Sequence, residues 1–120
     1  GIETVEDAVK AAKSNSKLNN ISNCKFVHGD VKNIIAKPIK GIKKPDIIIV
    51  DPPRNGLEKS VIKSIIDLSP YKIIYVSCNS STQARDIYEL RDFYKVKITQ
   101  AIDMFPQTYH VENVVLLEKI

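Results

Sequence analysis

The stretch DIIIVDPPRNGLEKSVIKSIIDLSPYKIIYVS, from Asp46 to Ser77, decides the fold class. It begins and ends with short apolar runs, DIIIV and KIIYVS, typical of strands that a parallel sheet buries on both faces. Between them, residues 57–68 place apolar side chains at helical spacing, and Ser69-Pro70 ends that pattern. A strand, a helix and a strand in this order predict a parallel pair joined by a crossover helix.

The same alternation extends to both sides of this unit. Before it, we expect strands at 1–3 and 23–28 and helices at 5–19, with Thr4 as N-cap, and at 31–36. After it, a helix is expected at 81–91, followed by two strand-like runs, 94–105 and 111–120. No helical pattern separates these last two runs, so they predict an antiparallel hairpin. The fold class is therefore α/β, with helices on both faces of a mostly parallel sheet.

Composition excludes several classes of protein. The chain has 120 residues, 43% hydrophobic and 27% charged, which suits one compact globular domain. No apolar run approaches the roughly 20 residues that span a bilayer, and, without a basic-then-apolar stretch at the start, we expect no marking for secretion. The net charge of +4 is concentrated in the first half, where Lys37, Lys40, Lys43 and Lys44 form the densest basic run. We interpret this run as a solvated loop, with attraction to phosphate as the alternative.

The two cysteines, Cys24 and Cys78, have no spacing that suggests a disulfide or a zinc site. We interpret Cys24 as a structural thiol at the start of a strand. Cys78 instead follows an apolar strand and precedes a helix whose N-terminus favours the thiolate form. From the residues alone, a small buried side chain and a nucleophile are both possible for Cys78.

Polar residues follow each predicted strand, where parallel α/β sheets bind their ligands. The last strand runs in the opposite direction, so its start lies at this same edge. The candidates are Glu3, Asp30, Asp51, Arg54, Cys78, His110 and Glu112. Each has an ordinary alternative: a turn or helix cap for the aspartates, and a solvated side chain for the others. Their convergence on one edge predicts a functional site.

Two segments resemble one enzyme family. DPPRNG (51–56), then sixteen residues, then IIYVSCNSST (73–82) is similar to one signature of the RNA uracil-5-methyltransferases, and IDMFPQTYHVE (102–112) is similar to another. The N-terminal pattern GIE, DAVKAAKSN and NN also resembles this family, so the resemblance covers essentially the whole chain. Ser80 departs from it, because the family usually has proline after the Cys-Asn pair. The resemblance implies bacterial enzymes that form 5-methyluridine in ribosomal or transfer RNA.

The resemblance also implies a role for each matching residue. Cys78 corresponds to the nucleophile and Glu112 to the general base. Glu3 and Asp30 correspond to S-adenosylmethionine contacts, at the ribose and the adenine. Asp51 corresponds to the strand-end aspartate beside the methionine moiety and the target base, and Arg54 is assigned to the substrate side. The implied cofactor is S-adenosylmethionine, with no metal.

The expected fold is a Rossmann-like S-adenosylmethionine-dependent methyltransferase fold that is incomplete. Its first strand and glycine-rich loop are absent, since none of the four glycines forms a Gly-x-Gly turn after an apolar strand. We therefore expect residues 1–120 to be the C-terminal part of a catalytic domain, inactive alone and prone to self-association through unpaired strands. The whole protein is expected to be a cytoplasmic monomer that acts on RNA, more specifically 23S rRNA, with tRNA as the alternative.

Two rival functions remain open. Amino-group methyltransferases also carry Asp-Pro-Pro at this strand end, but Arg54 and the Cys78–Glu112 pair argue against that class. A non-catalytic RNA-binding fragment is the other rival, supported by the lysine-rich first half.

Overall fold

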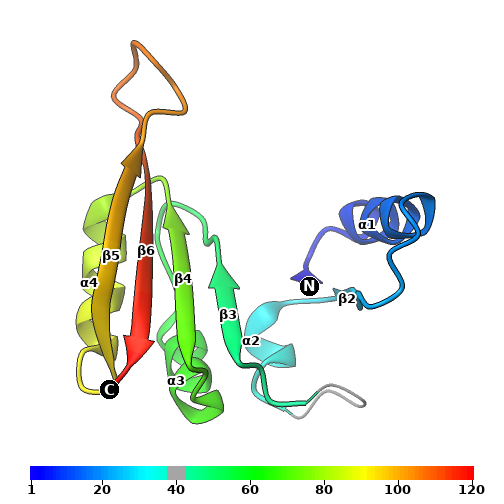
Figure 1. Cartoon of the computed structure of the whole chain (residues 1–120), viewed down its shortest axis with the longest axis horizontal. Helices are drawn as coiled ribbons and strands as arrows, with labels where there is room; N and C mark the ends of the chain where they lie inside the picture. The colour runs from blue at the N-terminus through cyan, green and yellow to red at the C-terminus, as the bar shows by residue number, and fades with distance from the viewer. Residues whose placement is uncertain (38–42) are drawn as a thin grey trace. The chain divides into compact units, whose positions relative to one another are not determined.

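The computed structural model describes residues 1–37 and 43–120, which form two compact units, Gly1–Ile42 and Lys43–Ile120 (Figure 1). Each unit is described by itself. Lys40, part of the basic run in the sequence, lies outside the described residues. Within the described ranges, every helix is too short or too polar to cross a bilayer.

The first unit contains a two-stranded parallel sheet and two helices. Strands β1 (Ile2–Glu3) and β2 (Val27–His28) pair with Glu3 opposite His28. Helix α1 (Glu6–Leu18) follows β1, and the short helix α2 (Val31–Ile34) follows β2. Because the two strands are parallel, the segments after Glu3 and after His28 leave the sheet at the same edge.

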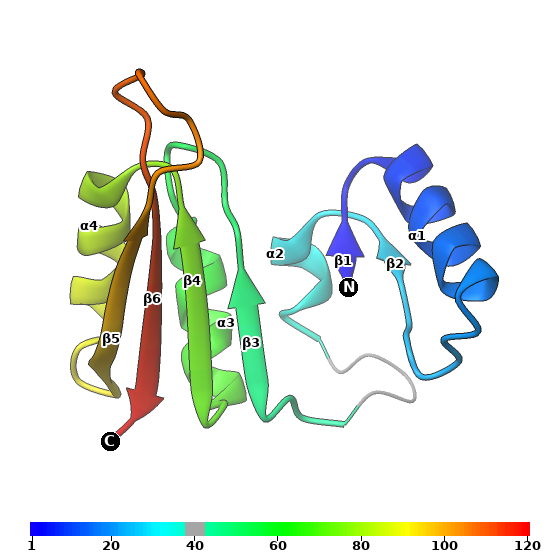
Figure 2. The ribbon, with the colours of Figure 1, turned by 45° about the horizontal axis from the view of Figure 1, so that its top comes forward.

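The second unit contains a four-stranded sheet in the order β3-β4-β6-β5. Strand β3 (Ile47–Val50) pairs in parallel with β4 (Lys72–Ser77). Strand β6 (Glu112–Lys119) is antiparallel to both β4 and β5 (Tyr94–Ile102), so the predicted hairpin is confirmed. Figure 2 shows the loop between β5 and β6 at the end of the sheet where β3 and β4 finish.

Helices α3 (Lys59–Leu68) and α4 (Ser80–Leu90) lie on the same side of this sheet in both views (Figures 1 and 2). The apolar side of α3, including Val61 and Ile65, is buried in the core. The sheet contributes alternate residues from β4 and their partners on β6 to that core, among them Ile73, Tyr75, Val115 and Leu117. This alternation is what a sheet with one covered face requires.

The structure corrects several predictions in detail. Strand β3 is not buried on both faces: Ile47 and Ile49 are 51% and 69% exposed, because β3 is an edge strand and the helices of its unit cover one face. The predicted strand at 23–28 is only Val27–His28, and Cys24 is exposed and lies before it. Thr4 does not cap α1; the N-cap is Val5, and the carboxylate of Glu3 accepts the hydrogen bond from the Val5 backbone.

Within the part of the chain that the structure describes, strands β1 and β3 each have an unpaired edge, as expected from the sequence. Among the described residues, no ladder joins β1 to β3, so each of these strands has one edge without a partner strand.

Candidate active site

The parallel strands β3 and β4 deliver two loops to one edge of the four-stranded sheet. After Val50 the chain continues into Asp51 and two prolines, which lack the N–H needed to extend the β3 ladder. After Ser77 it continues into Cys78 and Asn79, where α4 begins. Asp51 and Arg54 are exposed, whereas Cys78 is half-buried.

Short hydrogen bonds fix the turn that carries Cys78. The Ser77 hydroxyl donates to the Asn79 carbonyl and accepts from the Asn79 N–H, both at 3.0 Å. The Asn79 side chain then accepts from the Ser81 N–H at 3.1 Å and so caps α4. Cys78 is therefore held between two constrained residues at the positive end of a helix.

Helix α4 also holds the Asp51–Gly56 loop. The Arg54 carbonyl accepts hydrogen bonds from Asn79 Nδ2 at 3.1 Å and from the Thr82 hydroxyl at 3.0 Å. Arg85 Nη2 donates to the Asn55 carbonyl at 2.9 Å. The two ends of the DPPRNG–IIYVSCNSST signature, sixteen residues apart in the sequence, are therefore bound to each other through α4 and its N-cap.

A buried aspartate completes this connection. Asp86 is fully buried and accepts hydrogen bonds from the Tyr75 hydroxyl at 2.6 Å and the Leu57 N–H at 2.7 Å. Its other oxygen accepts from Arg85. Burial, and then the hydrogen bond to Asp86, raise the pKa of Tyr75 above its ordinary value. At Gly56 a Cβ atom would lie 2.5 Å from Asp86 Oδ2, so the loop approaches the carboxylate where only glycine fits.

Glu112 reaches the same edge from the opposite direction. The last paired residues of β4 and β6 are Ser77 and Asn113. Cys78 directly follows Ser77, the last residue of β4, and Glu112 directly precedes Asn113 as the first residue of β6. Cys78 and Glu112 therefore flank the same end of the β4–β6 ladder, although 34 positions separate them in the sequence.

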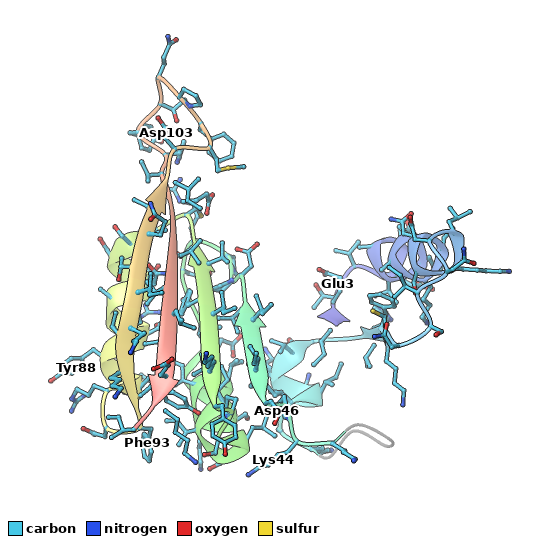
Figure 3. The ribbon with its side chains drawn as sticks, in the orientation of Figure 1. Glu3, Lys44, Asp46, Tyr88, Phe93 and Asp103 are labelled. Atoms are coloured by element: carbon cyan, nitrogen blue, oxygen red, sulfur yellow. The ribbon has the colours of Figure 1, made fainter. Side chains whose placement is uncertain are left out.

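In the first unit, Glu3 and Asp30 follow the neighbouring strands β1 and β2. Glu3 Oε1 accepts from the Val5 N–H at 2.8 Å and the Thr4 hydroxyl at 3.1 Å, and these bonds lower the pKa of the Glu3 carboxyl. Asp30 accepts from the Lys32 N–H at 3.0 Å and caps α2. Figure 3 shows the labelled Glu3 at the end of β1. Two carboxylates after adjacent parallel strands suit a ligand that offers hydroxyl or amino donors.

An aromatic loop lies between β5 and β6. Tyr109 is 84% exposed, and its ring centroid is 4.1 Å from that of His110. Phe105 is half exposed and meets His110 edge-on at 6.4 Å. The Thr108 hydroxyl donates to the Phe105 carbonyl at 2.7 Å and keeps the loop turned. Figure 3 shows Asp103 at the base of this loop, beyond the end of the sheet.

The structure thus places Asp51, Arg54, Cys78 and Glu112 at the same end of the four-stranded sheet of the second unit. Glu3 and Asp30 lie at or just after the ends of the paired strands of the first unit. In residues 1–37 and 43–120, no group of three or more His, Cys, Asp or Glu side chains could hold a metal ion. Sequence reasoning missed Gln83 and Asp86. Their signal was available, because both fall on the buried side of α4 together with Leu90, where an apolar residue is expected.

Comparison with known proteins identifies the family. The model of the tRNA (uracil-5-)-methyltransferase family matches residues 2–120. The chain belongs to this family. A solved member of similar sequence, the Pyrococcus abyssi tRNA (uracil-54, C5)-methyltransferase in complex with S-adenosyl-L-homocysteine, is 38% identical with a TM-score of 0.82, over 98% of this chain and 28% of that chain.

Curated relatives of this tRNA (uracil-5-)-methyltransferase family member carry a broader name. RNA methyltransferases from Caldanaerobacter subterraneus subsp. tengcongensis and Clostridium acetobutylicum are 47% and 51% identical over 100% and 99% of this chain. The chain spans only 27% and 26% of their lengths. A more distant structure, TrmN from Thermus thermophilus, is 16% identical with a TM-score of 0.72 over 99% of this chain and 35% of that chain, and shows the methyltransferase fold alone. The predicted fold class is therefore confirmed.

Proposed function

We propose that this chain is the catalytic part of an S-adenosylmethionine-dependent RNA methyltransferase that methylates carbon 5 of uridine. The observation that supports the proposal is the pairing of Ser77 with Asn113, because Cys78 follows the first and Glu112 precedes the second at the end of the sheet that also carries the Asp51–Gly56 loop. A thiol and a carboxylate at one end of a sheet suit the nucleophile and the base that methylation of a uracil ring requires.

The chemistry explains the need for both groups. Carbon 5 of uracil is a weak nucleophile until the Cys78 thiolate bonds to carbon 6, which pushes the electrons of the C5–C6 double bond toward carbon 5. Once carbon 5 carries the methyl group, Glu112 removes the remaining proton from carbon 5. The electron pair of that C–H bond restores the double bond, the bond from sulfur to carbon 6 breaks, and Cys78 is released as thiolate.

The residues of the first unit fit the methyl donor. S-adenosylmethionine supplies the methyl group from a sulfonium, which leaves as a neutral thioether. We assign Glu3 to the ribose hydroxyls, since its carboxylate is held in the charged form, and Asp30 to the adenine. We assign Asp51 to the methionine portion and the target base, and Arg54 to the RNA substrate.

Two RNA classes are candidates. Our sequence-based prediction is 23S rRNA. The alternative, tRNA, is supported by the description of the matching family and by the Pyrococcus abyssi relative at 38% identity. Methylation of tRNA and of 23S rRNA transcripts by the intact protein, followed by nucleoside analysis, distinguishes the two.

The proposed reaction is tested with RNA that contains 5-fluorouridine. Fluorine at carbon 5 cannot be removed as a proton is, so the enzyme should stop as a covalent protein–RNA adduct once methyl transfer has occurred. We expect an adduct that survives denaturing electrophoresis, requires S-adenosylmethionine and maps to Cys78. Methylation without an adduct would indicate an amino-group methyltransferase. Salt-sensitive RNA binding without methylation would indicate the non-catalytic RNA-binding alternative.

The aromatic loop is expected to bind RNA by stacking. A base extruded from its stack needs a new partner surface, and Tyr109 offers an exposed ring beside His110. Because stacking contributes about 1–3 kcal/mol per base, Tyr109→Ala should weaken RNA binding by roughly 5- to 150-fold in a filter-binding titration. The matched control is Tyr71→Ala, since Tyr71 is 72% exposed just before β4, at the opposite end of the sheet. Equal effects of the two substitutions would contradict this role.

A further inference from the structure

Gln83 is a buried amide whose hydrogen bonds all go to the two strands that carry the reactive residues. It is 1% exposed on α4. Its Nε2 donates to the Tyr75 carbonyl of β4 at 2.9 Å and to the Asn113 carbonyl of β6 at 3.1 Å. Its Oε1 accepts from Asn113 Nδ2 at 2.6 Å. Both ends of the amide are therefore satisfied, as burial of a polar group requires.

The contact to Asn113 is made twice. Gln83 holds the main-chain carbonyl of Asn113 through Nε2 and its side-chain amide through Oε1. These bonds fix the position and the rotation of the residue that directly follows Glu112. They lie at the start of β6, three residues beyond the exposed segment 103–109.

We propose that Gln83 and Asn113 are a positioning pair for the Glu112 carboxylate. The inference rests on the proposed function, in which Glu112 is the base. Alternation along β6 places the side chains of Asn113 and Glu112 on opposite faces of the sheet. With Asn113 bound to α4, Glu112 is directed to the face away from that helix, at the end of the sheet where Cys78 follows Ser77.

The pair should affect one step of the reaction and not the others. Glu112 takes its proton only after the bonds from sulfur to carbon 6 and from the methyl group to carbon 5 have formed. A displaced carboxylate therefore leaves adduct formation intact and slows the loss of the proton and the release of Cys78. The methylated adduct then accumulates, whereas a general loss of structure would reduce its formation.

The test uses Gln83→Leu in the intact protein, which keeps the side-chain size and removes all three hydrogen bonds. With natural uridine RNA, we expect the adduct to be visible on denaturing gels. Release of the RNA from Cys78 should be about 10- to 100-fold slower than in the wild type, which does not exceed the rate loss expected when a general base is removed. With 5-fluorouridine RNA, which needs no base, adduct formation should stay within about threefold of the wild-type rate.

Two controls separate this inference from the proposed function. Glu112→Gln should accumulate the same adduct on natural RNA; if it does not, the proposed function fails. If Glu112→Gln accumulates adduct but Gln83→Leu releases RNA at the wild-type rate, the positioning role alone is overturned. The positioning role is also overturned if Gln83→Leu reduces adduct formation equally on natural and on 5-fluorouridine RNA. Gln100→Leu is the matched change, because Gln100 is exposed on β5 and bonds only locally to Ala101.

A milder substitution keeps the inference testable if Gln83→Leu does not fold. Asn113→Ser removes only the Nδ2 bond to Gln83 and keeps both main-chain contacts. We expect slower release in the same direction, with unchanged adduct formation on 5-fluorouridine RNA. Wild-type release in Asn113→Ser would overturn the role of the side-chain pair.

Discussion

Cys78→Ala is expected to abolish methylation of uridine RNA by the intact protein, with a loss of turnover on the order of 10⁴-fold or more. Without the bond from sulfur to carbon 6, carbon 5 stays too weak a nucleophile to attack the methyl group. RNA binding should persist, because the aromatic loop and the lysines remain. Single-turnover methylation with radiolabelled methyl donor measures the loss, and filter binding measures the retained affinity.

The chain provides its own matched control for this substitution. Cys24 is the other cysteine, and it is exposed in the first unit, before β2. Cys24→Ala should therefore leave turnover within about twofold of the wild-type value. Turnover that survives in Cys78→Ala, or that disappears equally in Cys24→Ala, would contradict the assignment of the nucleophile.

Asp86→Ala is expected to destabilise the second unit by about 2–5 kcal/mol. The substitution leaves the Tyr75 hydroxyl and the Leu57 N–H without their acceptor in a buried site, at about 1–3 kcal/mol each. It also opens a cavity beneath Gly56. Hydrogen exchange of the intact protein, followed by mass spectrometry, should show faster exchange in residues 54–58 and in α4.

A surface aspartate gives the comparison for Asp86. Asp92 is exposed and faces Arg91 at 3.8 Å, a contact of the kind that contributes little to stability. Asp92→Ala should change the free energy of unfolding by at most about 0.5 kcal/mol. Similar exchange rates in the Asp86→Ala and Asp92→Ala variants would show that the buried hydrogen bonds contribute no more than a surface pair.

The sequence predicts the order of the elements because each element carries its own signal. Apolar runs end abruptly at Val50 and Ser77, and Pro70 follows the left-handed Ser69 that ends α3. The absence of a helical pattern between β5 and β6 was enough to predict the hairpin. Local patterns of this kind do not depend on what packs against them.

Predictions of burial and of helix capping failed where the result depends on which residues pack nearby in the folded chain. Ile47 and Ile49 have the composition of a doubly buried strand, but their exposure is set by the absence of a covering layer in their own unit. The start of α1 was assigned to the Thr4 hydroxyl, yet the longer Glu3 side chain reaches the Val5 N–H. Gln83 and Asp86 lie at helical spacing on the side of α4 that carries Leu90, but only the structure shows their partners: strands β4 and β6 for Gln83, and Tyr75 and the Leu57 N–H for Asp86.

In the β5–β6 hairpin, the loop proposed to stack on RNA and the residue proposed as the base lie on different parts of the chain. Glu112 pairs with Ile102 of β5, while the next residue, Asn113, pairs with Ser77 of β4 and bonds to Gln83 of α4. These contacts come from residues outside segment 103–109. Under the proposed function, this segment can therefore change in length and aromatic content, during evolution or by loop grafting, while the proposed base keeps its place.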